Sequence, residues 1–203
     1  MQIIHSEFLK SASGTQGFYQ DAVPEIAVVG RSNVGKSSFI NALTSNAKLA
    51  KTSSLPGRTR LVNYFSINHN LFRLVDLPGY GFAKASKAEQ EKWNGLMQAY
   101  FTQSKQLKMV VLLVDIRHEP TEKDVQMLEY LYYYNISTTI VATKCDKVPK
   151  SKILHYIKVI MTKLKVGKEN IFPFSSETKY GKEAVLKRLD QFIFPDASRA
   201  EEE

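Results

Sequence analysis

The sequence predicts an α/β fold in which a mixed, mainly parallel sheet is flanked by helices on both faces. Short β-branched segments alternate with longer helical segments, which is typical of strands joined by crossover helices. A glycine-containing turn separates the first apolar strand from the helix that follows it. The 203 residues, 43% of them hydrophobic and 24% charged, are enough to build one domain with a substantial core.

The first half of the chain supplies three strands and one helix. Glu25–Val29 (EIAVV) is a continuous apolar run that predicts a buried strand, and a helix is expected from Val34 to Leu43. Ala47–Arg60 is polar and contains Pro and Gly, so it is expected to be a loop. Tyr64–Ile67 and Leu71–Val75 are separated by a short Asn-rich turn that predicts a hairpin. We expect the strand at Leu71–Val75 to be the one antiparallel strand of the sheet.

The second half continues the alternation of helix and strand. Lys87–Thr102 has a helical pattern, and Lys108–Asp115 (KMVVLLVD) is a second continuous apolar strand. A helix is expected at Glu122–Tyr134, where Thr121 is a suitable N-cap. The remaining elements are expected at Ser137–Thr143 (strand), Ser151–Leu164 (helix), Ile171–Phe174 (strand) and Lys182–Phe194 (helix).

The chain is expected to form one main domain over residues 25–195. Residues 1–24 are expected to be an N-terminal extension packed on it, and residues 196–203 an acidic, flexible tail. No apolar run approaches the roughly 20 residues that span a bilayer, and the N-terminus lacks the pattern of a secretory signal. With Cys145 as the single cysteine, no internal disulfide can form. A cytoplasmic location is therefore expected.

The charge balance is basic, because 28 Lys and Arg residues exceed 20 Asp and Glu residues by eight. A basic surface concentrates polyanions such as nucleic acid and speeds encounter with them. The same balance also serves simple solubility, so charge alone leaves both interpretations open.

Gly30–Ser37 (GRSNVGKS) matches the phosphate-loop pattern GxxxxGK[ST] between a predicted strand and a predicted helix. Gly30 and Gly35 permit backbone angles and close approach that a Cβ would obstruct. Successive N–H groups can then surround an anion at the positive end of the helix dipole. Lys36 is expected to reach the β- and γ-phosphates, and the Ser37 hydroxyl to bind Mg²⁺. The segment predicts a nucleotide-phosphate site.

Two further segments are candidates for the metal and the γ-phosphate. Asp76–Gly79 (DLPG) closes a strand, where the carboxylate can hold Mg²⁺ through its water shell and the Gly79 amide can approach a γ-phosphate. In the loop Ser53–Arg60, the Thr59 hydroxyl could complete Mg²⁺ coordination with the triphosphate and release it after hydrolysis. Asp-x-Pro-Gly is also an ordinary turn, and before any resemblance is considered an ordinary loop threonine is the favoured interpretation of Thr59.

Thr143–Asp146 (TKCD) and Ser175–Glu177 (SSE) follow two later strands and suggest a base site. The Asp146 carboxylate can accept two hydrogen bonds from N1 and N2 of guanine, which adenine cannot supply. The aliphatic stem of Lys144 can cover one face of the purine, and a loop amide after the last strand can donate to O6. Each segment alone is typical of a solvated loop, but their order along the chain favours guanine.

The order GRSNVGKS, PGRT, DLPG, TKCD and FSSE resembles a translation-factor-class GTPase with a Ras-like G domain. The longer strings GRSNVGKSS, TSSLPGRT, VDLPGYGF and DIRH resemble the EngB family, also called YihA or YsxC, of bacterial ribosome-assembly GTPases. The resemblance covers roughly Glu25 to Phe194. It implies GTP and GDP binding with Mg²⁺, slow intrinsic hydrolysis, association with the maturing large ribosomal subunit, and a need for the protein in normal cell division and septation.

By position, the resemblance implies Mg²⁺ ligands at Ser37, Thr59 and Asp76 and catalytic roles for Lys36, Thr59 and Gly79. The residues that it places at the nucleotide are Gly30, Arg31, Ser32, Asn33, Val34, Gly35, Lys36, Ser37, Ser38, Gly57, Arg58, Thr59, Arg60, Leu61, Asp76, Leu77, Pro78, Gly79, Thr143, Lys144, Cys145, Asp146, Phe174, Ser175 and Ser176. The implied partners are guanine nucleotide and the large ribosomal subunit with its rRNA, and neither a membrane nor DNA. A monomer is expected.

Two departures from the wider GTPase pattern, and one resemblance to some of its members, affect the expected chemistry. Thr143 stands where many relatives have asparagine, which removes an amide but leaves Asp146. Tyr80 follows Gly79, where Ras-like enzymes have the glutamine that orients the attacking water, so slow turnover is expected. Asn33 resembles an asparagine that binds K⁺ in some related GTPases, but a role in the shape of the loop is the favoured interpretation.

Three classes of function are compatible with the sequence. The first is a GTPase switch in which GTP orders segments 47–60 and 79–85. The second is a nucleotide-regulated RNA- or protein-binding module in which turnover is incidental. The third is a small-molecule kinase that shares the phosphate loop, against which Asp146 and the lack of an evident lid argue.

Overall fold

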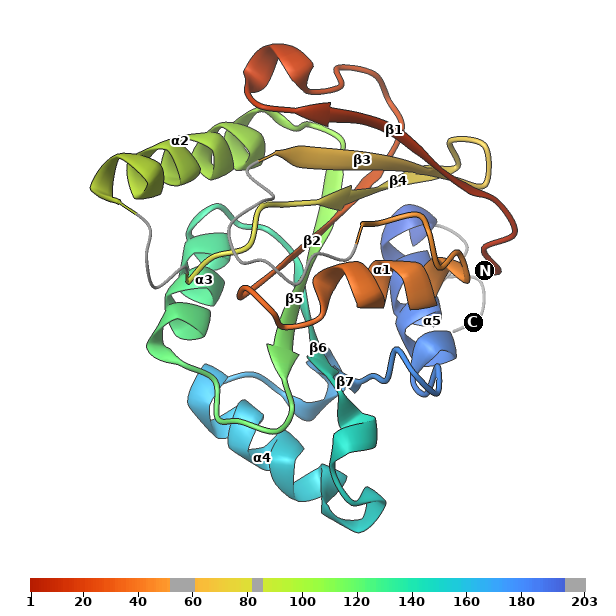
Figure 1. Cartoon of the computed structure of the whole chain (residues 1–203), viewed down its shortest axis with the longest axis vertical. Helices are drawn as coiled ribbons and strands as arrows, with labels where there is room; N and C mark the ends of the chain where they lie inside the picture. The colour runs from red at the N-terminus through yellow and green to blue at the C-terminus, as the bar shows by residue number, and fades with distance from the viewer. Residues whose placement is uncertain (52–60, 82–85, 196–203) are drawn as a thin grey trace.

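The computed structural model describes residues 1–51, 61–81 and 86–195 of the chain, and within them seven strands form one sheet (Figure 1). The order across the sheet is β1-β3-β4-β2-β5-β6-β7. The strands are β1 (Ser6–Ala12), β2 (Glu25–Gly30), β3 (Val62–Ile67), β4 (Phe72–Asp76), β5 (Leu107–Asp115), β6 (Thr138–Thr143) and β7 (Ile171–Pro173).

Helices cover both faces of this sheet, as predicted. They are α1 (Lys36–Thr44), α2 (Lys87–Gln103), α3 (Glu122–Tyr133), α4 (Ile153–Leu164) and α5 (Lys182–Ile193). One core contains α2, α3 and α4 together with Ala27 and Val29 of β2, whereas the other contains α1 and α5 with Ile26 and Val28 (Figure 1). Because β2 is buried on both faces, its sequence is a continuous apolar run rather than an alternation.

The prediction that Leu71–Val75 is the antiparallel strand is wrong. Strand β4 lies parallel to β2, with Ala27 opposite Val75, and β3 is the strand that runs against its neighbours β1 and β4. The predicted hairpin is present, since β3 and β4 pair across Asn68–Asn70. A hairpin fixes only the relative direction of its two strands, so the sequence could not show which one joins β2. Parallel pairing brings Asp76 to the same edge as Gly30.

Strand β1 was not predicted. It pairs antiparallel with β3, from Ser6 opposite Ile67 to Ala12 opposite Val62, with an irregularity between Phe8 and Lys10. The sequence SEFLKSA lacks an apolar alternation, because β1 lies at the sheet edge and most of its side chains are at least partly exposed. The chain then crosses to the amino ends of the central strands, where Phe18 packs on Tyr100 with ring centroids 5.5 Å apart.

The other predicted elements are present with small shifts in their bounds. Helix α1 begins at Lys36 rather than Val34, because Asn33 and Gly35 have positive φ angles and belong to the loop. The helix expected from Ser151 begins as a 3₁₀ turn at Lys150–Lys152. Thr121 caps α3 as predicted, and its backbone N–H donates to the Asp124 carboxylate over 2.7 Å. No helix in the described part of the chain is long and apolar enough to cross a membrane.

Candidate functional site

Four parallel strands bring the predicted site segments to one edge of the sheet. Strands β2, β4, β5 and β6 lie side by side and end at Gly30, Asp76, Asp115 and Thr143. The carboxyl edge of a parallel sheet is where ligands of open α/β folds bind. The predicted phosphate segment and the TKCD base segment therefore converge, although contacting residues such as Val34 and Thr143 are 109 positions apart in the sequence.

The loop Gly30–Lys36 has the shape that its glycines predicted. A Cβ on Gly30 would lie only 2.8 Å from Cγ1 of Val34 and 3.1 Å from Cβ of Leu113, so no side chain fits there. Asn33 and Gly35 adopt φ angles of 65° and 100°. Helix α1 begins with no side-chain cap and no acidic residue in its first turn, which leaves its N-terminal dipole available to an anion.

Lys36 and Asp76 form an ion pair at the mouth of this loop. Both side chains are largely buried, with 11% and 5% of their surfaces exposed. Nδ2 of Asn63 lies 3.4 Å from the second carboxylate oxygen of Asp76. The pair places one cationic and one anionic group beside the start of α1, where a phosphate and a hard cation would need them.

Gly79 and Tyr80 run against the start of the phosphate loop. A Cβ on Gly79 would lie 3.1 Å from the Gly30 carbonyl oxygen, and the Ser32 N–H donates to the Tyr80 carbonyl over 3.0 Å. The Tyr80 side chain points away into the core and donates its hydroxyl to Asp124 over 2.7 Å. Burial raises the pKa of Tyr80 well above its ordinary value. Its side chain is therefore committed to α3 rather than available to orient a water.

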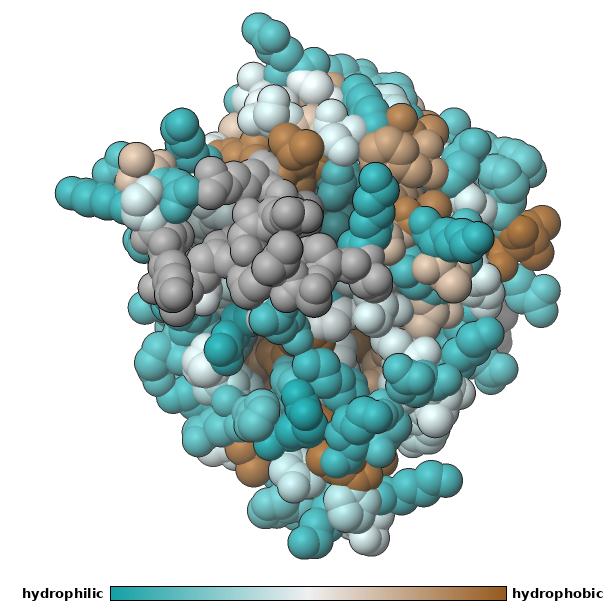
Figure 2. Space-filling view, in the orientation of Figure 1, coloured by the Kyte–Doolittle hydropathy of each residue, from teal (hydrophilic) through white to brown (hydrophobic). Residues whose placement is uncertain are grey.

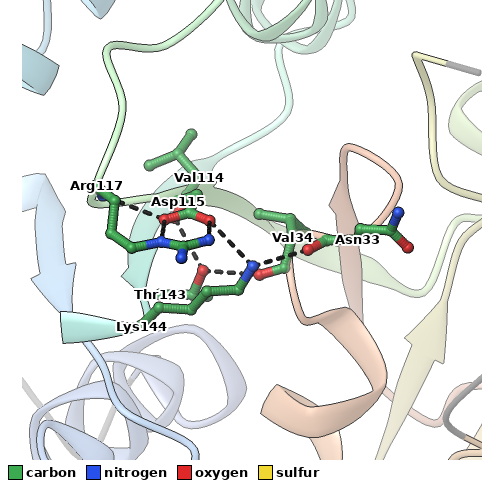
Figure 3. A network of polar contacts seen from close by, with 7 residues as sticks. All are labelled: Asn33, Val34, Val114, Asp115, Arg117, Thr143 and Lys144. Carbon is green, nitrogen blue, oxygen red and sulfur yellow. Dashed lines mark hydrogen bonds and ion pairs between the residues drawn. The ribbon is translucent and has the colours of Figure 1, made fainter. Parts of the chain in front are cut away.

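The TKCD segment is tied to the phosphate loop by hydrogen bonds (Figure 3). The Thr143 hydroxyl lies 2.8 Å from the Val34 carbonyl oxygen and 3.1 Å from that of Val114. Nζ of Lys144 donates to the Asn33 carbonyl over 2.9 Å. Lys144 has a φ angle of 62°, an uncommon conformation for a residue with a side chain. These contacts bring the two predicted halves of the site together.

Asp146 is held from the loop that follows β7. It accepts a hydrogen bond from the Ser175 hydroxyl over 2.7 Å, and that bond is the main reason why the pKa of Asp146 lies below its ordinary value. The Cys145 N–H donates to the Phe174 carbonyl over 3.1 Å. The Phe174 side chain is fully buried against Phe39, so it contributes to the core rather than to an accessible contact surface.

Some of the other predicted nucleotide residues lie outside the described part of the chain, and the rest differ in their exposure. Gly57, Arg58, Thr59 and Arg60 lie outside the described residues. Leu61 is exposed immediately before β3, whereas the side chains of Val34, Leu77 and Cys145 are buried. Arg31, Ser32, Ser37, Ser38, Pro78 and Ser176 belong to the segments that line this edge of the sheet.

Sequence reasoning did not identify Asp115 as a site residue. Its carboxylate binds Arg117 through both oxygens, at 2.9 and 2.7 Å, and Lys144 at 3.0 Å. The sequence did offer one indication. Asp115 is an acidic residue at the end of β5, which lies between β2, before the phosphate loop, and β6, before the TKCD segment. In the sequence, DIRH shows Asp115 near Arg117 but not its contact with Lys144, which lies 29 residues further along the chain.

The donor chemistry fits a magnesium nucleotide. Ser37 and Asp76 carry side-chain oxygen atoms, the type of ligand that Mg²⁺ prefers. The described residues contain no group of three or more His, Cys, Asp and Glu side chains that could hold a metal ion. Such a site suits Mg²⁺, which keeps several waters and commonly binds through substrate phosphates.

Comparison with known proteins gives the same answer as the geometry. The family described as 50S ribosome-binding GTPase matches residues 25–144. The chain is 48% identical over 194 residues to the probable GTP-binding protein EngB of Bacillus subtilis, covering 95% of this chain and 99% of that protein. It is 51% identical over 195 residues to the corresponding protein of Clostridium kluyveri, covering 95% and 98% of the two chains.

Solved structures share the fold. A crystal structure of a probable GTP-binding protein engB has a TM-score of 0.68 and 26% identity, and the match covers 83% of this chain and 98% of that one. A structure of Era has a TM-score of 0.65 at 20% identity, covering 85% of this chain and 57% of that one. The second likeness concerns the fold alone.

A phosphate loop, a DxxG segment and a TKxD segment at one edge of a Ras-like sheet define a guanine-nucleotide-binding GTPase of the P-loop class. This class excludes the small-molecule kinase that the sequence had left open. Within the class, the chain belongs to the EngB family of GTP-binding proteins.

Proposed function

We propose that this protein is a Mg²⁺-dependent GTPase switch that acts in the cytoplasm, as a monomer, during assembly of the large ribosomal subunit. We further propose that cells need it for normal division and septation. The description of its family as 50S ribosome-binding supports the ribosomal part of the proposal.

In this proposal, different residues of the site bind the phosphates, the Mg²⁺ ion and the guanine base. The backbone of Gly30–Ser37 and Nζ of Lys36 would bind the phosphates, and the ion pair with Asp76 holds Nζ beside that position. Ser37, Asp76 and Thr59 would hold Mg²⁺, which when bound neutralises charge on the phosphates. Asp146 would accept hydrogen bonds from guanine, in a carboxylate form that the Ser175 hydroxyl favours.

Slow intrinsic hydrolysis is part of the proposal. The hydroxyl of Tyr80 is bound to Asp124, so this side chain does not reach toward the phosphate loop. Turnover would then depend on a group supplied by the ribosome or on a cation held by Asn33, whose side-chain amide points away from Lys144 (Figure 3). Comparing turnover in K⁺ with turnover in Na⁺ tests the second route, and equal rates would remove it.

One observation carries the ribosomal part, namely a concentration of positive charge around α4. Residues 147–168 contain seven lysines and no acidic residue, so this segment accounts for seven of the eight net positive charges. Six of the seven are exposed, and Lys163 pairs with Glu122. Figure 2 shows mainly hydrophilic side chains over the lower part of the molecule, where α4 lies. Such a surface suits the phosphate backbone of RNA.

The test is co-sedimentation of the full chain with purified large ribosomal subunits, in GDP and in a non-hydrolysable GTP analogue. We expect retention with the GTP analogue, and a loss of affinity of about 10³-fold when salt rises from 50 to 200 mM. A variant with Lys150, Lys158 and Lys165 changed to Glu should lose retention. A matched control changes Lys92, Lys105 and Lys187 to Glu, three exposed lysines outside the α4 segment.

Two results would contradict the proposal. Equal retention with GDP and with the GTP analogue would contradict a nucleotide-dependent switch. Equal loss of retention in the two triple variants would mean that binding depends on the net charge of the protein rather than on the lysines around α4.

The commitment of Tyr80 to the core also favours a second candidate, a nucleotide-regulated binding module in which turnover is incidental. The two candidates differ in whether hydrolysis is needed in the cell. A variant that binds GTP but hydrolyses it more slowly should fail to replace the normal protein in cell growth if the switch is correct, and should replace it if turnover is incidental. Lys36→Ala, which loses phosphate binding, should fail under both.

A further inference from the structure

The carboxylate of Asp115 joins the base segment to the turn that follows β5 (Figure 3). Its Oδ1 accepts the backbone N–H of Arg117 over 3.1 Å and Nε of the same residue over 2.9 Å. Its Oδ2 accepts from a second guanidinium nitrogen over 2.7 Å and from Nζ of Lys144 over 3.0 Å. Only 17% of the Asp115 side-chain surface is exposed, so these contacts are partly shielded from solvent.

Lys144 is held at its far end by two acceptors, one in a loop and one at the end of a strand. Its ammonium lies between the Asn33 carbonyl of the phosphate loop and the Asp115 carboxylate at the end of β5. The aliphatic stem passes over the phosphate loop, since a Cβ on Gly35 would lie 3.8 Å from Cε of Lys144. A lysine side chain has about 2 kcal/mol of rotamer entropy to lose, so the stem needs tethers to stay in one place.

We propose that Asp115 is a positioning residue for guanine-nucleotide binding, which fixes the ammonium of Lys144 so that the lysine stem lies along the face of the base. This proposal rests on the proposed place of the base between Lys144 and Asp146. Asp115 itself touches no nucleotide in this scheme, and it acts through Lys144 alone.

The tether is a permanent one. Burial acts to raise the pKa of Asp115, but hydrogen bonds from Arg117 and Lys144 outweigh it and bring the pKa to about 2. The carboxylate is thus charged throughout the physiological range, and protonation does not release Lys144.

A competing explanation is that Asp115 only shapes the turn to Arg117. Asp115→Asn separates the two roles, because the amide oxygen can still accept the Arg117 N–H while the amide nitrogen offers Lys144 no acceptor. Arg117→Gln is the matched control, since it removes the other partner of the same carboxylate and leaves the contact with Lys144.

The experiment measures GDP affinity and dissociation of a fluorescent GDP analogue from the full chain. For Asp115→Asn we expect affinity to fall about tenfold, mainly through faster dissociation, because a charge-assisted hydrogen bond is lost. Single-turnover hydrolysis at saturating GTP should be unchanged, since Asp115 does not reach the phosphates. Arg117→Gln should alter GDP affinity by less than about threefold. In a Lys144→Ala background, Asp115→Asn should have no further effect.

Three results would overturn the proposal: unchanged affinity in Asp115→Asn, an equal loss in Arg117→Gln, or losses from Asp115→Asn and Lys144→Ala that simply add. Thermal melting without nucleotide checks that each variant is folded. Failure of the proposed base site looks different, because the unaltered protein would then bind ADP as well as GDP.

Discussion

The two ends of the central strands both carry buried charges, but they hold them in different ways. At the carboxyl end, Lys36, Asp76, Lys144 and Asp115 pair with one another and with loop carbonyls, and the Lys144 side chain keeps 29% of its surface exposed. At the amino end, Arg73 pairs with Asp21 and Glu25, and Glu25 also accepts hydrogen bonds from two hydroxyl groups. Phe18 of the N-terminal segment packs against this cluster. Similar chemistry therefore serves binding at one end and stability at the other.

The amino-end cluster consists of Arg73, Asp21, Glu25, Tyr100 and Ser104. Arg73 donates to the two oxygens of Asp21 over 2.8 and 2.5 Å, and its guanidinium lies 3.7 Å from Glu25. Tyr100 and Ser104 each donate a hydroxyl to Glu25 over 2.8 Å. Glu25 is only 1% exposed, so its charge depends on these partners.

The partners of the charged groups at the two ends indicate which of these groups could bind a ligand instead. Around Glu25 the partners are side chains of β4, of α2 and of the residue that follows α2, and Glu25 itself is almost fully buried. Around Lys36 and Lys144 the partners are the last residues of β4 and β5 and a carbonyl of the phosphate loop. We therefore expect changes at the amino end to alter the free energy of unfolding, and changes at the carboxyl end to alter nucleotide affinity.

The largest effect is expected for Arg73→Met. It would leave Glu25 buried without its cationic partner, and breaking a buried pair from one side costs about 3–5 kcal/mol. Urea unfolding of the nucleotide-free protein measures this loss, while the GDP affinity of the folded fraction should not change. Adding Glu25→Gln should recover part of the loss. A weakened GDP affinity would contradict the separation of the two ends.

Asp146→Ala is expected to lower the affinity for GDP while leaving the free energy of unfolding nearly unchanged. Loss of the two hydrogen bonds that we propose between Asp146 and guanine should weaken GDP binding about 100-fold, or about 2.7 kcal/mol, and reduce the preference over ADP. The free energy of unfolding of the nucleotide-free protein should change by less than about 0.5 kcal/mol. The reason is that Asp146 follows a strand in a loop, where its protein partners are Ser175 and Lys147. Calorimetry with both nucleotides, beside urea unfolding, measures the two effects. A large loss of stability with selectivity retained would break the comparison.

The fold was predictable from sequence wherever strands are buried on both faces, because β2 and β5 then show continuous apolar runs. The edge strand β1 and the direction of β4 were not, since pairing partners depend on contacts between distant segments. In the same way, the motif residues of the site could be located, but Asp115 could not. Its role depends on Lys144, which directly follows the neighbouring strand β6 and is 29 residues away in the sequence.

Thr143→Val tests a contact between the two halves of the carboxyl end. Valine keeps the shape but removes the hydroxyl that reaches the Val34 and Val114 carbonyls, so we expect a loss of about 1–2 kcal/mol in unfolding. GDP affinity should also fall by about three- to tenfold, because Val34 belongs to the phosphate loop. The matched control is Thr139→Val, another buried threonine of β6, whose loss should be confined to stability. Equal GDP affinity in both variants would show that Thr143 does not organise the loop.

The smallest expected effect is a dependence of the free energy of unfolding on pH, which we attribute to the Glu25 carboxyl group. Burial raises the pKa of Glu25 above its unfolded value of 4.5, against the hydrogen bonds of Tyr100 and Ser104. Between 4.5 and the raised pKa the folded state binds more protons than the unfolded state, so stability should fall as pH rises through this window. The slope cannot exceed about 1.4 kcal/mol per pH unit for one group.

Glu25→Gln should abolish that slope, which urea unfolding at intervals from pH 4.5 to 7 would measure. The pKa values of Asp21, Asp115 and Asp146 are lowered, so their contributions are lost only as pH falls below about 4 and do not enter this window. For the same reason GDP affinity, which depends on Asp146 at the other end, should stay flat over the range. A slope that persists in Glu25→Gln would mean that another group controls the amino end, and a parallel change in GDP affinity would mean that the two ends are coupled.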